Sequence, residues 1–248
     1  MNLTAFFERI HYSGSTMPTL SVLTALQRQF LLHVPFENLY IRNKTALDLS
    51  HDGVFEKIVL KQRGGVCFEA NALFHDALQV LGFDVTFIGA EMNSGQPLGG
   101  MRNHMALIVT IASERYLVDV GNGRDFGEPK RVDRPSATMG EDTQYKVDSF
   151  EGMKALYRLN EESVWEPRYI FSDTPWQRED FSTASHFVQT SPESWFTQKT
   201  LVSLRTNDGR MTLSDGLLIH TVNNVRDEKP VSESESTQLL KDIFGLSE

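Results

Sequence analysis

The chain has 248 residues, enough for one large domain or for two or three small domains that share an interface. Lys and Arg number 24 against 33 Asp and Glu, and the resulting net charge of -9 argues against a nucleic-acid partner. The single cysteine excludes an intramolecular disulfide and a metal site built from several cysteines, so the reducing cytoplasm is the expected compartment.

The first third of the chain has the apolar spacing of helices. The opening segment shows it from residue 3 to residue 10, and it lacks the basic region and apolar run of a signal peptide. A second helix is expected after Pro18, with Thr19 as its N-cap. The apolar stretches are too short to span a membrane, so we expect no membrane partner.

Two more helices flank a pair of glycines. The apolar residues of the segment 54–59 recur at helical spacing, and Gly64 and Gly65 then end that helix. The next helix is predicted to begin near Cys67 and to close at Gly82. These patterns predict a helical bundle over residues 1–82.

From residue 83 the apolar period changes from 3.6 toward 2. Six short β-rich segments follow within about ninety residues, separated by turn residues. The segment "HMALIVTIASERYLVDVG" has the pattern of a hairpin with its tip near residues 112–114. A small antiparallel barrel or sandwich is therefore expected over residues 83–175.

The remaining residues, 176–248, mix both types of element. The segment 178–196 is expected to be helical or irregular, and residues 201–222 resemble a hairpin that turns at 207–209. A terminal helix follows, with Ser232 or Ser234 as its cap. The whole chain is thus of the α+β class, with a helical, a β and a mixed α/β part.

Three residues form a candidate catalytic set. Cys67 would lie in the first turn of a helix, and a helix N-terminus or a neighbouring imidazolium favours the nucleophilic thiolate. His104 begins an apolar strand, and the returning strand of the hairpin brings Asp119 close to it. Nucleophile, base and orienting carboxylate would then be together. Spacing alone also allows a buried structural thiol, a surface histidine and a carboxylate that caps a turn.

Several motifs then resemble one enzyme family. The segment "RGGVCFEAN" (63–71) is similar to the active-site signature of the arylamine N-acetyltransferases, and "VPFENL" (34–39) is similar to their upstream motif. The segments "HMALIV" and "VDVG" resemble the two later catalytic strands, and residues 190–213 resemble the C-terminal region. The resemblance covers nearly the whole chain in one order.

The resemblance implies a fold and a reaction. The fold is a helical domain, a β-barrel domain and an α/β lid, with a cysteine-protease-like catalytic core. In the reaction the Cys67 thiolate takes the acetyl group of acetyl-CoA, and a small aromatic amine or hydrazine then accepts it. His104 would act as the base and Asp119 would orient it. No metal is implied, and no oligomeric state is predicted.

The same resemblance suggests supporting residues. The charges of Glu37 and Arg63 are flanked by apolar residues, so we expect them to form an ion pair that ties "PFEN" to the catalytic helix. Phe36 is expected to stack on the arylamine, with core packing as the alternative. Gly64 and Gly65 would allow a close approach of the backbone to the substrate.

Four residues are candidates for CoA binding. Gly121, Asn122 and Gly123 follow the catalytic aspartate, and Phe187 lies in the lid, although a plain tight turn would also explain the glycines. The family usually has an aromatic residue, most often Phe, where this chain has Asn122. We therefore expect bulky arylamines to bind weakly and Asn122→Phe to improve their turnover. The chain is also somewhat short for the family, so a more open lid and CoA cleft are expected.

Two other function classes fit parts of the pattern. A cysteine hydrolase of the papain or transglutaminase type would also use the order Cys-His-Asp and a cysteine at a helix start. A non-enzymatic binding protein could retain the same fold. The motifs beyond the three residues favour acetyl transfer over both.

Overall fold

The computed structural model describes residues 1–93, 100, 102–122, 127–140, 143–223 and 225–246. Its N-terminal part is helical, as predicted, and comprises α1 (Leu3–Arg9), α2 (Leu20–His33), α3 (Leu39–Arg42), α4 (His51–Phe55), the π-helix η1 (Glu56–Leu60) and α5 (Cys67–Val80). The side chain of Thr19 accepts a hydrogen bond from the Val22 N–H, which confirms it as the N-cap of α2. No helix among the described residues is long and apolar enough to cross a membrane.

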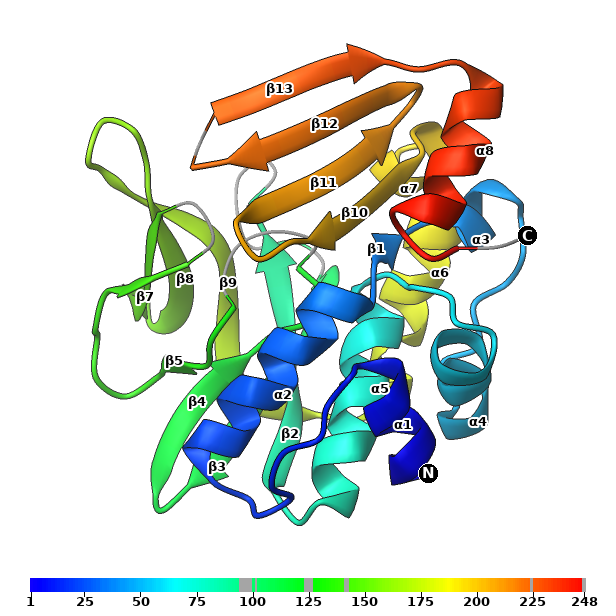
Figure 1. Cartoon of the computed structure of the whole chain (residues 1–248). Coiled ribbons are helices and arrows are strands. Elements are labelled where there is room, and N and C mark those ends of the chain that lie inside the picture. The colour runs from blue at the N-terminus through cyan, green and yellow to red at the C-terminus, as the bar shows by residue number, and fades with distance from the viewer. Residues whose placement is uncertain (94–99, 101, 123–126, 141–142, 224, 247–248) are drawn as a thin grey trace.

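Helix α5 lies at the centre of the molecule (Figure 1). It packs against α1 and α4 on the helical side and against two strands of the barrel, β2 (Asp84–Met92) and β3 (His104–Ile111). All its residues from Cys67 to Leu78 are buried. An apolar helix covered on every side holds its first residue in a defined place, which is the requirement for a positioned nucleophile.

The β part is one antiparallel sheet that curls into a nearly closed barrel. Its strands lie in the order β5-β4-β3-β2-β9-β8-β7-β6. Lys130 of β5 donates to the Thr138 hydroxyl of β6, so the two edges of the sheet meet. This confirms the expected α+β class and, of the two alternatives, the barrel. The remaining strands are β4 (Glu114–Val118), β5 (Lys130–Arg131), β6 (Thr138–Met139), β7 (Gln144–Phe150), β8 (Met153–Leu159) and β9 (Trp165–Trp176).

The predicted β3–β4 hairpin is confirmed. Ile111 pairs with Glu114, so the loop consists of Ala112 and Ser113 alone. Both have positive φ angles, 49° and 67°, as a two-residue type I′ turn requires. This tight turn sets the register that brings the far ends of β3 and β4 together.

A second antiparallel sheet, the C-terminal sheet, covers one end of the molecule (Figure 1). Its order is β1-β10-β11-β12-β13. Residues 201–222 therefore form three strands, where a single hairpin was predicted, because a second tight turn with positive φ follows at Asp215 and Gly216. The strands are β1 (Phe36–Glu37), β10 (Leu201–Arg205), β11 (Gly209–Ser214), β12 (Leu217–Val222) and β13 (Val225–Pro230).

The helices of the C-terminal part flank this sheet and the helical bundle. They are the 3-10 helix η2 (Arg178–Phe181), α6 (Ser182–Thr190), α7 (Trp195–Gln198) and α8 (Glu233–Asp242). The segment 178–196, expected to be helical or irregular, is thus helical apart from a turn at 191–194, and Ser232 caps α8, as predicted. Strand β1 comes from the N-terminal part, so the C-terminal sheet is built from both ends of the chain.

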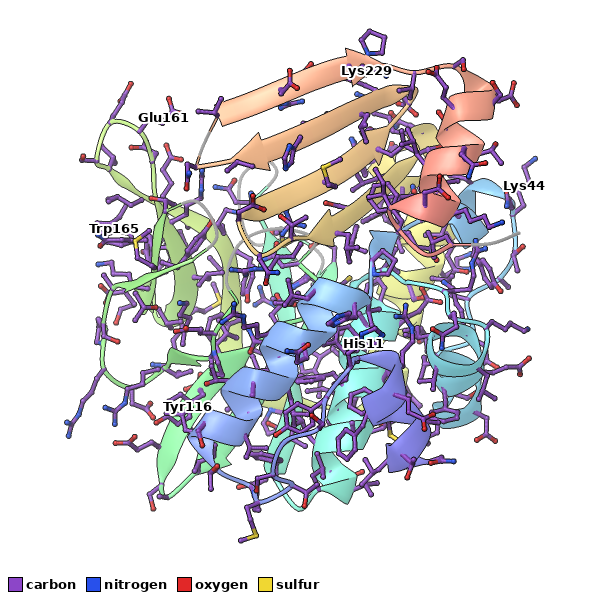
Figure 2. The ribbon with its side chains drawn as sticks, in the orientation of Figure 1. His11, Lys44, Tyr116, Glu161, Trp165 and Lys229 are labelled. Atoms are coloured by element: carbon purple, nitrogen blue, oxygen red, sulfur yellow. The ribbon has the colours of Figure 1, made fainter. Side chains whose placement is uncertain are left out.

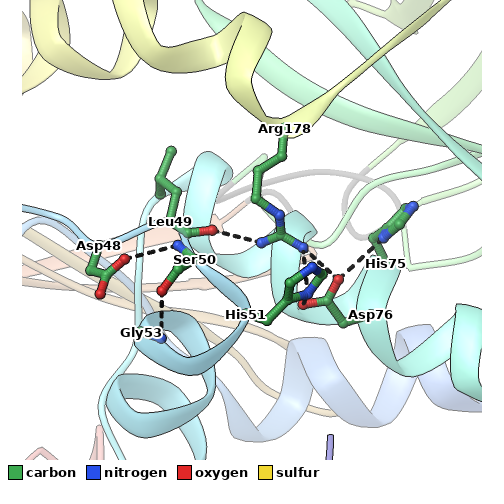
Figure 3. Close-up of polar contacts among 8 residues, drawn as sticks. All are labelled: Asp48, Leu49, Ser50, His51, Gly53, His75, Asp76 and Arg178. Atoms are coloured by element: carbon green, nitrogen blue, oxygen red, sulfur yellow. Dashed lines mark hydrogen bonds and ion pairs between the residues drawn. The ribbon is translucent and has the colours of Figure 1, made fainter.

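One buried carboxylate joins the start of the C-terminal part to α5 (Figure 3). Arg178 donates to the Leu49 carbonyl at 2.7 Å and forms an ion pair with Asp76. The other Asp76 partners are His51 Nδ1 at 2.7 Å and His75 Nδ1 at 3.3 Å. Burial opposes the charge of Asp76, but hydrogen bonds from the histidines and the charge of Arg178 lower its pKa. The cluster therefore fastens η2 to the helix that carries Cys67.

Candidate active site

Cys67 is the first residue of α5 and is only 4% exposed. The N–H groups of this first turn have no partners within the helix and point toward its N-terminal end. Glu69 satisfies the N–H of Val66 at 3.1 Å, and Lys57 forms an ion pair with Glu69 at 2.7 Å. Burial raises the pKa of Glu69, and the charge of Lys57 opposes that rise. The helix start is thus fixed by a buried charge pair.

His104 and Asp119 meet at one end of the β3–β4 hairpin. His104 is the first residue of β3, and Asp119 follows the last residue of β4. Their side chains are joined by a hydrogen bond of 2.7 Å between His104 Nε2 and Asp119 Oδ2. Both residues are buried, at 3% and 1% exposure. The predicted pairing of imidazole and carboxylate is present.

The imidazole of His104 also faces Cys67. Burial lowers the pKa of the ring, but the charge of Asp119, its hydrogen bond and the neighbouring Cys67 together raise the pKa of His104 to about 10. Cys67 therefore lies close enough to the ring that Asp119 holds to stabilise its charged form. The structure brings together the three residues that the sequence singled out.

Two further residues orient Asp119. Asn71 Nδ2 donates to Asp119 Oδ1 at 2.9 Å, and the Tyr169 hydroxyl donates to Oδ2 at 3.2 Å. Asn71 lies one helical turn after Cys67, so its place beside the site follows from the i, i+4 spacing, which sequence reasoning left unused. Tyr169 comes from β9, and only the pairing of β2 with β9 brings it here. No local sequence signal identifies it.

Gly121 lies directly against the nucleophile. A Cβ at this position would be 2.5 Å from Cys67 Cα and 2.7 Å from Asn71 Nδ2. Its N–H donates to Asp119 Oδ1 at 2.8 Å. The absence of a side chain therefore allows the segment after β4 to touch α5, which is a sufficient reason for glycine here.

A cavity of about 490 Å³ opens between the barrel and the C-terminal sheet, and Phe36 and Asn122 line it. The ring of Phe36 is 6.1 Å from that of Phe196. Among the described residues, no hydrogen-bond partner is found for either polar atom of the Asn122 side chain, although both atoms are buried. Phe187 packs against the main core and does not line this cavity. Gly123 lies outside the described residues.

Three arginines and one carboxylate, that of Glu161, line the cavity. Arg158 comes from β8, and Arg210 and Arg226 come from β11 and β13 of the C-terminal sheet. Arg210 donates to the Ser203 hydroxyl at 3.0 Å, which holds its guanidinium at the sheet surface. Guanidinium groups bind phosphate and carboxylate oxygens in two-point contacts. The cavity is therefore suited to an anionic ligand, and nothing in the sequence pattern pointed to these three residues.

The predicted ion pair between Glu37 and Arg63 is wrong. Glu37 pairs instead with Lys57 at 3.6 Å, and the guanidinium of Arg63 lies 5.7 Å from the centre of the Tyr40 ring. Lys57 on η1 thus lies between the buried carboxylates of Glu37 and Glu69. The "PFEN" segment is therefore tied to the catalytic helix α5, as expected, but the linking side chain is Lys57 of η1 and not Arg63.

The two glycines before Cys67 serve backbone packing. A Cβ on Gly64 would be 2.0 Å from the Pro35 carbonyl oxygen, and one on Gly65 would be 2.9 Å from Glu69 Cβ. We expected the backbone of Gly64 and Gly65 to approach the substrate closely. It approaches the "PFEN" segment and α5 instead. Among the described residues, no group of three or more His, Cys, Asp or Glu side chains could hold a metal ion.

Comparisons with known proteins agree with this fold and site. The sequence model of a family described as N-acetyltransferase matches residues 19–247, nearly the whole chain. The fold is therefore that of an N-acetyltransferase, which favours acetyl transfer over the hydrolase alternative. Arylamine N-acetyltransferase 1 of Homo sapiens is 32% identical over 274 residues, covering 100% of this chain and 94% of the relative. The chain belongs to the arylamine N-acetyltransferase family.

Solved structures of the family have the same fold. The arylamine N-acetyltransferase of Salmonella typhimurium superimposes with a TM-score of 0.93 at 27% identity, covering 98% of this chain and 90% of that one. The enzyme of Mycobacterium marinum in complex with CoA superimposes with a TM-score of 0.91 at 28% identity, covering 99% and 93%. The helical part, the barrel and the C-terminal sheet are thus a shared architecture.

Proposed function

We propose that the protein transfers the acetyl group of acetyl-CoA to an arylamine or a hydrazine through a thioester on Cys67. Acetyl transfer to arylamines follows from the family. The covalent route is carried by one observation, the His104 imidazole held between Asp119 and the buried Cys67 at the N-terminus of α5. This set has the parts that nucleophilic acyl transfer needs.

The first half-reaction acetylates the cysteine. The high pKa of His104 keeps its ring protonated at neutral pH, and an imidazolium beside the sulfur favours the thiolate. The thiolate attacks the carbonyl carbon of acetyl-CoA, and backbone N–H groups near Cys67 stabilise the oxyanion. The carbon–sulfur bond to CoA then breaks, and CoA leaves as the thiolate or takes a proton from His104.

The second half-reaction regenerates the enzyme. Acetylation removes the charge from the sulfur, so His104 loses one of the interactions that raise its pKa and can act as a base. The amine nitrogen attacks the thioester carbonyl and gives up a proton to His104. The intermediate collapses with loss of the Cys67 thiolate, and the acetylated amine departs.

The cavity supports a binding site for CoA. The phosphates of CoA are anions, and Arg158, Arg210 and Arg226 provide guanidinium groups in the lining of the cavity. The M. marinum relative, whose structure contains CoA, has the same fold. Gly121 lies against Cys67, and the next residue, Asn122, lines the cavity, which suits the two to contact the arm of CoA that carries the thioester.

The acceptor would enter through the same cavity after CoA has left. Phe36 offers a ring surface on the cavity wall for an aromatic amine, and its own ring is supported by that of Phe196. Within the described part of the chain the side-chain amide of Asn122 has no partner, and a buried polar group without a partner favours a ligand that can bond to it. An acceptor with a polar substituent or a hydrazide carbonyl fits this wall better than a bulky apolar amine.

Intact-protein mass spectrometry tests the proposal. Wild type and Cys67→Ala are incubated briefly with acetyl-CoA without an acceptor. We expect a gain of about 42 Da, one acetyl group, on wild type only, and its loss when an arylamine or a hydrazide is added. The absence of this adduct, with Cys67 still readily alkylated by iodoacetamide at pH 6, would refute acetyl-CoA as the donor and favour hydrolase chemistry.

A further inference from the structure

The first helix of the chain is tied to the segment before Cys67 through one side chain, that of Arg9. The family model begins at residue 19, so α1 lies outside the matched region. Arg9, the last residue of α1, is nevertheless buried, with 8% of its surface exposed. Helix α1 lies against α5 and η1, on the helical side of the molecule (Figure 1). The guanidinium of Arg9 therefore points into the helical part.

Three backbone carbonyls receive the guanidinium of Arg9. Nε donates to the Ile58 carbonyl at 2.8 Å, Nη2 donates to the Arg63 carbonyl at 3.1 Å, and Nη1 donates to the His33 carbonyl. His33 is the last residue of α2, and Ile58 lies within η1. The ends of helices carry partial negative charge at their carbonyls, which suits a cation. The planar guanidinium spreads its donors over three nitrogens and can hold three separate segments at once, whereas the three donors of a lysine share one nitrogen.

The three carbonyls stabilise the buried charge of Arg9. No carboxylate among the described residues forms an ion pair with it, and burial lowers the pKa of Arg9 to about 10. A buried charge is tolerated only where its hydrogen bonds are complete. A shift of any one carbonyl would therefore be opposed by the cost of leaving the guanidinium unbonded.

One of the three carbonyls belongs to the segment that leads to the nucleophile. Residues 63–66, here called the lead-in segment, run directly into Cys67. Gly65 in this segment donates its N–H to the Pro35 carbonyl at 3.2 Å and accepts from the Glu37 N–H at 3.1 Å. Arg9 thus holds one end of the lead-in segment, and the strand that carries Phe36 holds the other.

We propose that Arg9 is a positioning residue for the acetylation of Cys67, acting by fixing the lead-in segment so that the sulfur meets the imidazole of His104. The proposal rests on the proposed role of Cys67 as the nucleophile. It assigns α1 a part in the reaction beyond its contribution to the core. Without the guanidinium, α1 still packs through Phe6 and Ile10, which are both fully buried, but the lead-in segment loses its anchor.

Alkylation of Cys67 by iodoacetamide tests this without acetyl-CoA. At pH 6 the rate depends on the imidazolium beside the sulfur, whereas at pH 9 a thiol ionises without help. We expect Arg9→Met to lower the alkylation rate at pH 6 about tenfold and the rate at pH 9 much less, since a misplacement of 1 Å can cost about a hundredfold. Single-turnover acetylation by acetyl-CoA should fall in parallel.

Two matched controls separate positioning from stability. Phe6→Leu loosens α1 without touching the three carbonyls, so it should lower Tm but leave the ratio of the pH 6 and pH 9 rates as in wild type. Glu8→Gln changes an exposed neighbour and should change neither quantity. Arg9→Lys keeps the charge but not the fork, so its ratio should lie between those of wild type and Arg9→Met.

An unchanged rate ratio in Arg9→Met, with a loss of Tm like that of Phe6→Leu, would overturn the proposal. If Arg9→Met does not fold, Arg9→Gln replaces it, and an unchanged ratio there has the same meaning. A wild type that resists alkylation at pH 6 would instead refute the nucleophile assignment, and with it the role of Arg9. The two failures are therefore distinguishable.

Discussion

The contact between Gly121 and Cys67 predicts that the smallest possible side chain at position 121 disables the enzyme. In Gly121→Ala, the new Cβ would lie 2.5 Å from Cys67 Cα, about 0.9 Å inside the 3.4 Å of ordinary contact. The neighbouring atoms are Cys67 Cα and Cβ, which are fixed to the helix backbone, and the hydrogen-bonded Asn71 amide, so they cannot swing away. A displacement of about 1 Å between nucleophile and base costs on the order of a hundredfold in rate. We expect kcat/KM to fall by about that factor.

The assay is steady-state acetylation of an arylamine, with Tm recorded for each variant. Gly152→Ala is the control, because Gly152 also lies in a tight turn, but a Cβ added there would have no atom within 4 Å, and the residue is far from Cys67 in the chain. Its positive φ of 81° should cost about 1 kcal/mol of stability and leave kcat/KM unchanged. Activity of Gly121→Ala within threefold of wild type would refute the reasoning.

Three other predictions follow from the site and its surroundings. Tyr169→Phe removes a donor to Asp119, and the lost orientation should lower kcat/KM about tenfold in steady-state assays, so unchanged kinetics would show that Asn71 orients Asp119 alone. Asn122→Phe should raise kcat/KM for bulky arylamines by adding ring surface to the cavity, and an unchanged or lower value would contradict it. Burial lowers the pKa of His33 below its ordinary value near 6.5, so the unfolded chain binds more protons and stability falls as the pH drops below about 6.5. Urea midpoints at pH 7.5 and pH 5.5 should differ less in His33→Gln than in wild type. An equal difference would show that His33 does not cause the loss of stability in acid.

The histidine prediction concerns the same corner of the molecule as Arg9. His11, labelled in Figure 2 where α1 meets α2, stacks on His33 with the ring centres 4.2 Å apart. Repulsion from His11 and Arg9 adds to the effect of burial on the pKa of His33. Acid should therefore weaken the attachment of α1 before it affects the barrel.

Local sequence predicted the elements that carry the reacting groups. The glycine pair followed by a helical apolar pattern placed Cys67 at the start of α5, and the β3–β4 hairpin brought His104 and Asp119 to one end. Helix periodicity, turn residues and strand alternation are properties of short segments. They can therefore be recognised without knowledge of the rest of the chain.

Contacts between distant segments could not be predicted in this way. Lys57, rather than Arg63, pairs with Glu37, because the π-helix η1 turns the lysine toward two buried carboxylates. Asn38 donates to the carbonyls of Phe196 and Lys199, about 160 residues away, and so fixes β1 against β10. Such pairings depend on which surfaces meet in three dimensions.

The amino-acid sequence by itself determined the class of fold, the order of the elements and the three residues of the proposed reaction, because each of these follows from local pattern and motif. Only the tertiary structure decided how those residues are held. Tyr169, Arg9 and the arginines of the cavity come from elements far apart in the chain. The free energy that holds them in place arises from burying and hydrogen-bonding charged groups, which is a property of the packed molecule.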